Sequence, residues 1–154
     1  MRLYYVIKQL VAAVAISIAL SSYASAQPPT NFYKQANCLA TNIYFEARGE
    51  PIKGQIAVAM VTLNRVADEA FPKTICEVVY QGRPSRGKCQ FSWYCDGKSD
   101  KIPKNSPEKR IAMLIAIAVM NIPIQDPTNG ALYFNSSSKK YSDNAIKIGD
   151  HIFY

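Results

Sequence analysis

The sequence predicts a small α+β domain that is mostly helical and carries a short antiparallel β-sheet. Two stretches, residues 33–48 and 53–67, have apolar side chains at helical spacing, and a Gly-Glu-Pro corner separates them. A third stretch, residues 111–120, contains no polar residue and is expected to form another helix. Short runs of apolar and aromatic residues at 131–134 and 151–154 predict two strands.

Residues 1–26 have the pattern of a secretory signal peptide. Arg2 and Lys8 give a basic start, an apolar run follows, and residues 24–26 form an Ala-Ser-Ala cleavage site. The alternative is a retained membrane anchor, but the apolar run is shorter than the ~20 residues that a membrane span needs. We therefore expect a single mature domain of residues 27–154, exported to the periplasm or cell envelope or secreted, without a stable membrane span.

The formal charge of +7 falls to +5 when Arg2 and Lys8 are removed with the signal peptide. This modest excess suits an anionic polymer such as a cell wall, and it is equally common on proteins that simply remain soluble. The basic residues are spread along the chain and form no known nucleic-acid-binding module. We therefore expect no binding of DNA or RNA.

Glu46 is the candidate catalytic residue of the first expected helix. It follows Leu39 and Ile43 at i, i+4 and i+7, so its carboxyl group shares a helical stripe with two apolar side chains. Partial removal from water disfavours the charged form and so raises the pKa of a carboxyl group. Such a group stays protonated closer to neutral pH and can act as a general acid. The alternative is a solvated surface charge. Gly49, expected in a left-handed conformation, and Pro51 then end the helix.

The second expected helix spans residues 53–67 and presents one apolar face. That face consists of Ile56, Ala59, Met60, Leu63 and Val66. The two helices should form a hairpin with Glu46 beside the turn. Residues 74–80 are short and rich in β-branched side chains, so they predict either a strand or one more helical turn.

Residues 81–105 form a long loop, and a loop of this length in a small domain is usually functional or disordered. Cysteines at 89 and 95 favour an ordered loop. Between them lie Gln90, Phe91, Ser92, Trp93 and Tyr94. Aromatic rings stack on sugars and polar side chains hold hydroxyl groups, so this segment could form one wall of a saccharide cleft. The alternative is a local core in which Phe91 and Trp93 pack beneath the loop.

All four cysteines lie in the expected mature domain. An even number of cysteines in an exported chain favours disulfide bonds. Three pairings are possible among Cys38, Cys76, Cys89 and Cys95, and the sequence does not choose between them. A zinc site is the rival interpretation, but the spacing contains no Cys-x-x-Cys pair and only His151 could help as a ligand. The sequence thus predicts neither a metal nor another cofactor.

A further helix is expected to begin at residues 106–108, where serine, proline and glutamate form a typical helix start. Because residues 111–120 are wholly apolar, we expect this helix to be the central core helix, buried on nearly every side. It is too short to cross a bilayer. Residues 126–130 are typical of a turn, and the strands at 131–134 and 151–154 follow.

Five segments resemble, in order, the signatures of the SleB-type cell wall hydrolases, which are named for the spore cortex-lytic enzyme. These segments are residues 38–51, 54–66, 89–93, 128–134 and 148–154. The resemblance covers nearly all of the expected mature chain. It implies a lysozyme-like α+β fold related to lytic transglycosylases, with a peptidoglycan glycan strand as the substrate. It also implies that the first glutamate of Glu-Ala-Arg-Gly-Glu, Glu46, is the catalytic acid.

The resemblance and the expected hairpin together suggest the other residues of the site. Those expected to bind substrate are Gln90, Phe91, Ser92, Trp93, Tyr133, Asn135 and His151. The last three face the cleft if the terminal strands form a hairpin beside it. His151 could be an acid or base, or a hydrogen-bonded structural residue. Arg48 and Arg65 could orient Glu46 or the second helix, or form structural ion pairs, with Glu50 as a natural partner.

Glycosidases that use water normally need two carboxylates. The second candidates are Glu50, Asp96 and Asp126, and none lies on the expected face of Glu46. Enzymes similar to this family use one glutamate, which protonates the leaving oxygen and then takes a proton from the 6-hydroxyl of muramic acid as a 1,6-anhydro ring closes. We therefore predict a monomeric lytic transglycosylase that cleaves the MurNAc–GlcNAc backbone, with hydrolysis as the close alternative.

Three alternatives come from other functional classes. The domain could be a non-catalytic peptidoglycan-binding protein, or a secreted interaction protein or inhibitor with the same lysozyme-like fold, because fold alone does not fix function. An N-acetylmuramoyl-L-alanine amidase is the third, although that chemistry usually needs a metal site or a reactive nucleophile.

Overall fold

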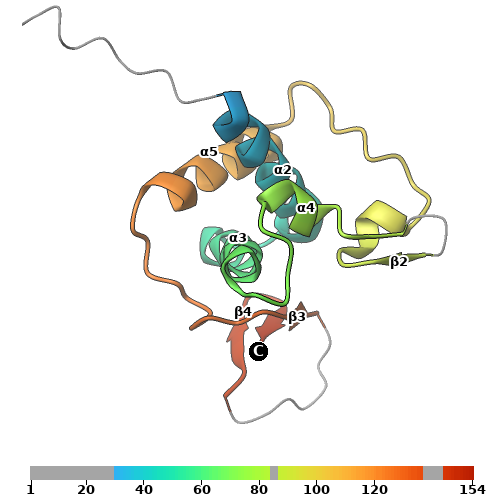
Figure 1. Cartoon of the computed structure of the whole chain (residues 1–154). Coiled ribbons are helices and arrows are strands. Elements are labelled where there is room, and N and C mark those ends of the chain that lie inside the picture. The colour runs from blue at the N-terminus through green and yellow to red at the C-terminus, as the bar shows by residue number, and fades with distance from the viewer. Residues whose placement is uncertain (1–29, 84–86, 137–143) are drawn as a thin grey trace, which may run out of the picture.

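The structure, a computed structural model, describes residues 30–83, 87–136 and 144–154 (Figure 1). The helices are α2 (Thr30–Ala47), α3 (Ile52–Ala67), α4 (Ile75–Val79) and α5 (Pro107–Asn121), with a short 3-10 helix η2 (Ser92–Cys95). The strands are β1 (Gly82–Arg83), β2 (Lys88–Cys89), β3 (Phe134–Asn135), β4 (Ile146–Ile148) and β5 (His151–Phe153). The predicted α+β class is confirmed. The expected signal peptide lies outside the described residues.

Helices α2 and α3 form the predicted hairpin, joined by a tight turn. The backbone N–H of Glu50 donates to the carbonyl of Ala47 at 2.9 Å, and α3 begins directly after Pro51. The prediction for Gly49 is wrong, because this residue is not among the glycines with positive φ. The turn is closed by the Glu50 hydrogen bond instead of a left-handed residue. The hairpin leaves Glu46 in the last turn of α2.

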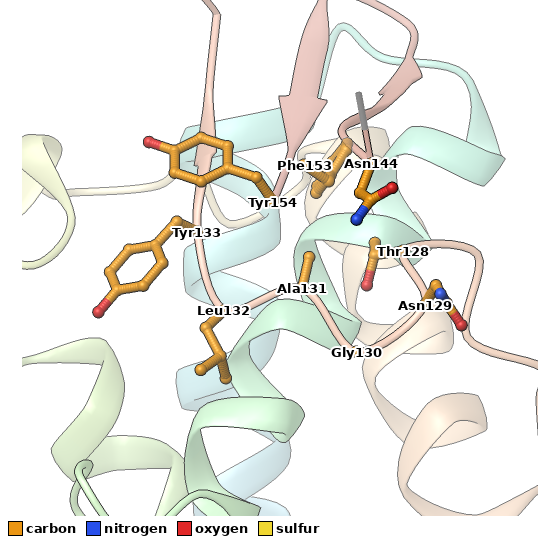
Figure 2. A pocket seen from close by; sticks show the side chains of 9 residues that line it. All are labelled: Thr128, Asn129, Gly130, Ala131, Leu132, Tyr133, Asn144, Phe153 and Tyr154. Atoms are coloured by element: carbon orange, nitrogen blue, oxygen red, sulfur yellow. The ribbon is translucent and has the colours of Figure 1, made fainter. Parts of the chain in front are cut away.

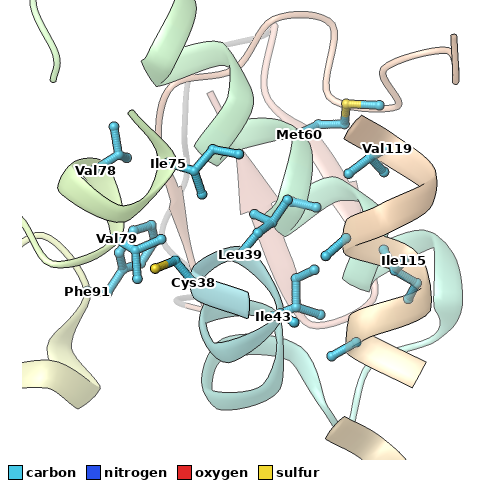
Figure 3. Packing of buried hydrophobic residues seen from close by; sticks show 14 of the residues in the cluster. Cys38, Leu39, Ile43, Met60, Ile75, Val78, Val79, Phe91, Ile115 and Val119 are labelled. Atoms are coloured by element: carbon cyan, nitrogen blue, oxygen red, sulfur yellow. The ribbon is translucent and has the colours of Figure 1, made fainter. Parts of the chain in front are cut away.

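Helix α3 lies between two apolar clusters and so forms the middle layer of the domain (Figure 1). On one side, Ala59 and Met60 join a helical cluster that contains the fully buried Leu39 and Ile43 of α2 (Figure 3). On the other side, small residues pack on the C-terminal sheet: Ala57, Val58 and Val61 contact the cluster of Ile148 and Phe153. The predicted apolar face covers the first side only.

Helix α5 packs against the domain with one face, so the prediction that it is buried on nearly every side is wrong. Its buried residues are Ala112, Ile115, Ala116 and Val119. By contrast, Leu114 is 68% exposed and Ile111 is 39% exposed. The helix starts as expected, because the hydroxyl of Ser106 accepts a hydrogen bond from the backbone N–H of Lys109. It contacts α2 and α3 from the edge of the helical layer, which leaves its outer face without a partner among the described residues.

The C-terminal sheet has three antiparallel strands in the order β3-β5-β4. The strand expected at residues 131–134 begins only at Phe134, although the backbone N–H groups of Leu132 and Tyr133 already bond the carbonyl of Tyr154. Strand β4 was not predicted. Pairing Ile148 with His151 and Phe134 with Phe153 brings both outer strands onto β5.

Two disulfide bonds link the cysteines in pairs that the sequence left open. Cys38–Cys76 joins α2 to α4, and Cys89–Cys95 closes the short loop that contains η2. The segment after residue 74 is helical rather than extended, because the hydroxyl of Thr74 caps the backbone N–H of Glu77. None of the helices in the described ranges combines the length and apolar character of a membrane span.

Candidate active site

A pocket of about 280 Å³ opens beside the end of α2, where α3, the disulfide-closed loop and the C-terminal sheet meet. Its lining residues are Glu46, Arg65, Cys89, Gln90, Phe91, Ser92, Tyr133, Phe134, Asn135, Ser136 and His151. The pocket thus collects Glu46, Arg65 and six of the seven residues that the sequence analysis expected to bind substrate. Segments more than 100 residues apart in the chain contribute to it.

Glu46 is half-buried at this pocket, and burial raises the pKa of its carboxyl group to about 7. The positive charge of Arg65 acts in the opposite direction and lowers the pKa, but by less. The apolar neighbours on the stripe, Leu39 and Ile43, are fully buried. The structure thus gives the partly dry carboxyl group that the sequence predicts, and this group keeps its proton to a higher pH than an ordinary glutamate does.

Arg65 is the buried cation of the pocket, and it is held by several groups. Its Nε donates to the carbonyl of Leu132 at 2.7 Å. With its amide oxygen turned towards Arg65, Gln90 accepts from Nη1 at 3.3 Å and from Nη2 at 3.1 Å. Three rings surround the guanidinium, with centroids 5.1 to 5.5 Å from Cζ: Phe71, Phe91 and Tyr133. This cage fixes a positive charge close enough to act on Glu46.

A second pocket of about 390 Å³ adjoins the first, because Glu46 and Ser92 line both. Its other lining residues are Phe45, Arg48, Trp93, Asp96, Lys98, Ser99 and Asp100. Glu46 therefore lies where the two hollows adjoin, and the two pockets together are called the groove. A proton donor at such a junction could reach the bond between two units of a bound polymer.

Comparison with known proteins places the chain in a family. The cell wall hydrolase family matches residues 49–154, more than half of the chain. The chain belongs to the cell wall hydrolase family. The match begins just after Glu46, so the role of that residue depends on the geometry described above.

Relatives of the chain include the spore cortex-lytic enzymes of Bacillus cereus and Oceanobacillus iheyensis. They are 36% and 38% identical over 121 residues, and each match covers 75% of the chain. The matched part is 42% of the first relative and 39% of the second, so the chain spans less than half of their length.

Two solved structures resemble the domain. The catalytic domain of the germination-specific lytic transglycosylase SleB from Bacillus anthracis is 34% identical, with a TM-score of 0.56, and the match covers 77% of this chain and 92% of that one. The catalytic domain of the Bacillus cereus SleB protein is 29% identical, with a TM-score of 0.55 and coverage of 84% and 98%. The chain thus has the fold of a SleB catalytic domain.

Trp93 lines the second pocket and is absent from the lining of the first. It and Phe91 are 7% and 3% exposed, so both pack beneath the loop, as the alternative interpretation proposed. The indole Nε1 of Trp93 donates to Oδ1 of Asn42 at 3.0 Å, and its ring stacks on Phe45. These aromatic side chains therefore support the lining of the groove: Phe91 in the first pocket, and Trp93 and Phe45 in the second.

The arginines and Glu50 do not pair as the sequence analysis suggested. Arg48 is exposed, and its guanidinium lies over the ring of Tyr44 and donates to the carbonyl of the same residue. Glu50 instead faces His151, with Oε1 of the carboxylate 3.9 Å from Nδ1 of the imidazole. The suggested pairing fails because the tight turn after α2 directs Glu50 towards the C-terminal sheet.

Other carboxylates of the domain differ in their access to the groove. Asp126 accepts hydrogen bonds from Asn64 and from the turn at residues 128–130, so it is a structural residue. Asp96 lines the second pocket, and so does Asp100, which the sequence analysis missed. Helical periodicity could not indicate either residue, because both lie in the loop after η2.

A more open hollow of about 450 Å³ shares Tyr133 with the first pocket (Figure 2). It is lined mainly by residues 128–133, together with Asn144, Phe153 and Tyr154. Within the described part of the chain, no aspartate or glutamate lines this hollow. We therefore take the two adjoining pockets at Glu46 as the candidate active site.

The raised pKa of Glu46 predicts a specific pH dependence of stability. The pKa of Glu46 is about 7 in the folded protein and 4.5 in the unfolded chain, so between these pH values the folded state retains a proton that the unfolded chain has released. The free energy of unfolding should therefore fall by about 3 kcal/mol as the pH rises from below 4.5 to above 7. The side chain of Glu46→Gln cannot ionise. The free energy of unfolding of this variant, relative to that of the wild type, should therefore be about 3 kcal/mol higher at pH 8 than at pH 4. Urea unfolding at both pH values checks this, and an equal difference at the two would contradict it.

Proposed function

We propose that this protein cleaves the MurNAc–GlcNAc backbone of peptidoglycan as a lytic transglycosylase, with Glu46 as the catalytic acid. The observation that carries the proposal is a carboxyl group with a pKa of about 7 at the junction of two adjoining pockets. A glycan that fills both pockets would present its glycosidic oxygen to this group. The similar Bacillus anthracis domain is named a lytic transglycosylase, which supports the same reaction class.

The proposed reaction needs one carboxyl group in two roles. Glu46 first gives its proton to the glycosidic oxygen as the bond from that oxygen to C1 of MurNAc breaks. The 6-hydroxyl of the same MurNAc then attacks C1, and its proton returns to the Glu46 carboxylate. A 1,6-anhydro ring forms and the acid is regenerated, so no water is consumed. The nearby positive charge of Arg65 stabilises the carboxylate between the two steps.

The remaining lining residues are proposed to bind the sugar units. Tyr133, Ser92 and Asn135 line the first pocket and carry groups that can hydrogen bond hydroxyl or acetamido groups. Gln90 is proposed to act mainly by holding Arg65, since its amide oxygen faces that side chain. Arg48 lines the second pocket, where the adjoining sugar unit would lie.

We propose that the enzyme works outside the cytoplasm after removal of residues 1–26, as a monomer. Two disulfide bonds support export, because such bonds persist in oxidising compartments. Peptidoglycan, the proposed substrate, also lies there.

Hydrolysis is the second candidate reaction, because Asp96 and Asp100 line the groove together with Glu46. Either carboxylate could activate a water molecule, as in two-carboxylate glycosidases. The two reactions give different products. A lytic transglycosylase leaves 1,6-anhydro-muramoyl ends, whereas hydrolysis leaves reducing ends that take up oxygen from water.

Digestion of purified peptidoglycan in ¹⁸O-labelled water, followed by mass spectrometry of the muropeptides, tests this proposal. We expect anhydro-muropeptides without incorporated ¹⁸O. Reducing ends that carry ¹⁸O would instead show that the protein hydrolyses the glycan, and the transglycosylase proposal would be wrong. If the sacculi are unchanged, the protein is a non-catalytic glycan-binding protein. If stem peptides are released while the glycan strands stay intact, it is an amidase.

A further inference from the structure

His151 and Glu50 form a buried pair at the wall of the first pocket, and the proposed reaction does not use it. Their side chains are 9% and 11% exposed, and Nδ1 of His151 lies 3.9 Å from Oε1 of Glu50. Nδ1 is fully enclosed and has no hydrogen-bond partner among the described residues. Since His151 also lines the pocket, Nε2 is the ring nitrogen that a bound ligand can reach.

The carboxylate of Glu50 is held in a closely fitted socket. Its Oε2 accepts a hydrogen bond from the backbone N–H of Asp150 at 3.1 Å. Gly149 has a φ of +59°, and a methyl group added there would overlap Oε2. A methyl group added at Gly54 would lie 3.0 Å from Cβ of Glu50. The two glycines therefore leave the space that the Glu50 side chain occupies, and the hydrogen bond from Asp150 holds its carboxylate there.

The imidazole ring of His151 is also fixed in orientation. The ring of Phe134 meets it edge to face, with centroids 5.1 Å apart, and Phe153 lies 6.1 Å away. A lone pair on Nδ1 directed at a carboxylate oxygen would be repelled, whereas an N–H there is attracted. The proton of the neutral ring therefore belongs on Nδ1, and Nε2 is left as a hydrogen-bond acceptor.

We propose that Nε2 of His151 accepts a hydrogen bond from a sugar hydroxyl of the bound glycan, and that Glu50 is the positioning residue that sets the tautomer. The identity of the ligand as a glycan rests on the proposed function. Arg65, Ser92 and protonated Glu46 all offer hydrogen-bond donors at this pocket. A nitrogen acceptor complements them, because a sugar hydroxyl can donate as well as accept.

The tautomer can be observed directly, because His151 is the only histidine in the chain. Long-range ¹H–¹⁵N spectra of protein labelled at histidine should show a protonated Nδ1 and a bare Nε2 in the absence of glycan. Glu50→Leu should move the proton to Nε2, and Glu50→Gln, which keeps an oxygen acceptor, should move it less. Circular dichroism verifies that both variants are folded. A proton on Nε2 in the wild type would overturn the inference, whatever the protein's substrate.

Ligand contact is tested in the Glu46→Gln variant, which should bind glycan without consuming it. On addition of a (GlcNAc–MurNAc)₂ tetrasaccharide, we expect a saturable change in the Nε2 resonance. If the amides of Gln90 and Ser92 respond but Nε2 does not, the glycan binds without His151 and only this inference fails. If nothing responds, the glycan does not bind and the proposed function fails with it.

Kinetics of two His151 variants complete the test. His151→Phe keeps a ring against Phe134 but removes the acceptor, and it should lower kcat/KM about tenfold. His151→Gln can place its amide oxygen near the position of Nε2 and should recover part of that loss. Equal losses in the two variants, with unchanged thermal stability, would contradict a role as acceptor.

Discussion

Replacing Glu46 with glutamine is expected to slow peptidoglycan degradation by about 1,000-fold, within the range that general acid catalysis contributes. Glutamine has nearly the same size, so the groove should persist, but its amide cannot donate a proton to a glycosidic oxygen. The rate is measured as the release of soluble muropeptides from purified sacculi at pH 6, where most Glu46 side chains are protonated. Binding, followed by co-sedimentation with sacculi, should change little.

Glu69→Gln is the matched control for this experiment. Glu69 is an exposed glutamate just after α3, and it lines neither pocket of the groove. The same substitution there should leave the rate within about twofold of the wild type, as for most surface changes. Sacculi that dissolve at the normal rate with Glu46→Gln would exclude Glu46 as the acid and would direct attention to Asp96 and Asp100.

Removing the Cys38–Cys76 disulfide is expected to lower the free energy of unfolding by about 4 kcal/mol. This bond closes a loop of 38 residues, whereas Cys89–Cys95 closes one of only 6. Loop-closure entropy in the unfolded chain therefore predicts a smaller loss, about 2 kcal/mol, for the second bond. Urea unfolding of the two double alanine variants, at one pH, measures both values.

The two disulfide variants should also differ in activity. The shorter bond holds the segment that contributes Gln90, Phe91 and Ser92 to the pocket, so its removal should reduce turnover even where the protein is folded. The longer bond joins α2 to α4, away from the groove lining, so its removal should affect stability more than turnover. The opposite order of stability losses would show that strain or residual structure outweighs chain entropy. Full reduction of the wild type should reproduce the sum of both losses.

Much of the site was predictable because its signals are local. The stripe of Leu39, Ile43 and Glu46 follows from the period of one helix, and the structure places all three as that period requires. The turn after α2 was also expected at its correct position. Such signals depend only on residues that are close in the sequence, so they can be recognised before the residues on the other side of the groove are known.

Features that depend on distant partners could not be predicted in this way. The partner of Glu50 is the hairpin around residue 150, 100 residues away in the chain, and no sequence pattern links the two. Strand β4 is three residues long and becomes a strand only by pairing with β5. Likewise, the apolar composition of α5 predicts that the helix is buried, but it does not show that other elements cover only one of its faces.

The contact between Glu50 and the turn at Gly149–Asp150 has a mechanical consequence for the groove. It links the turn after α2, four residues beyond Glu46, to the hairpin that carries His151, so these two parts of the site are held next to each other. The segment between Cys89 and Cys95 is attached to the same helix from the other side, because Trp93 donates to Asn42 and stacks on Phe45. Both walls of the groove are therefore anchored to α2, and a bound strand has to fit the spacing that this helix sets.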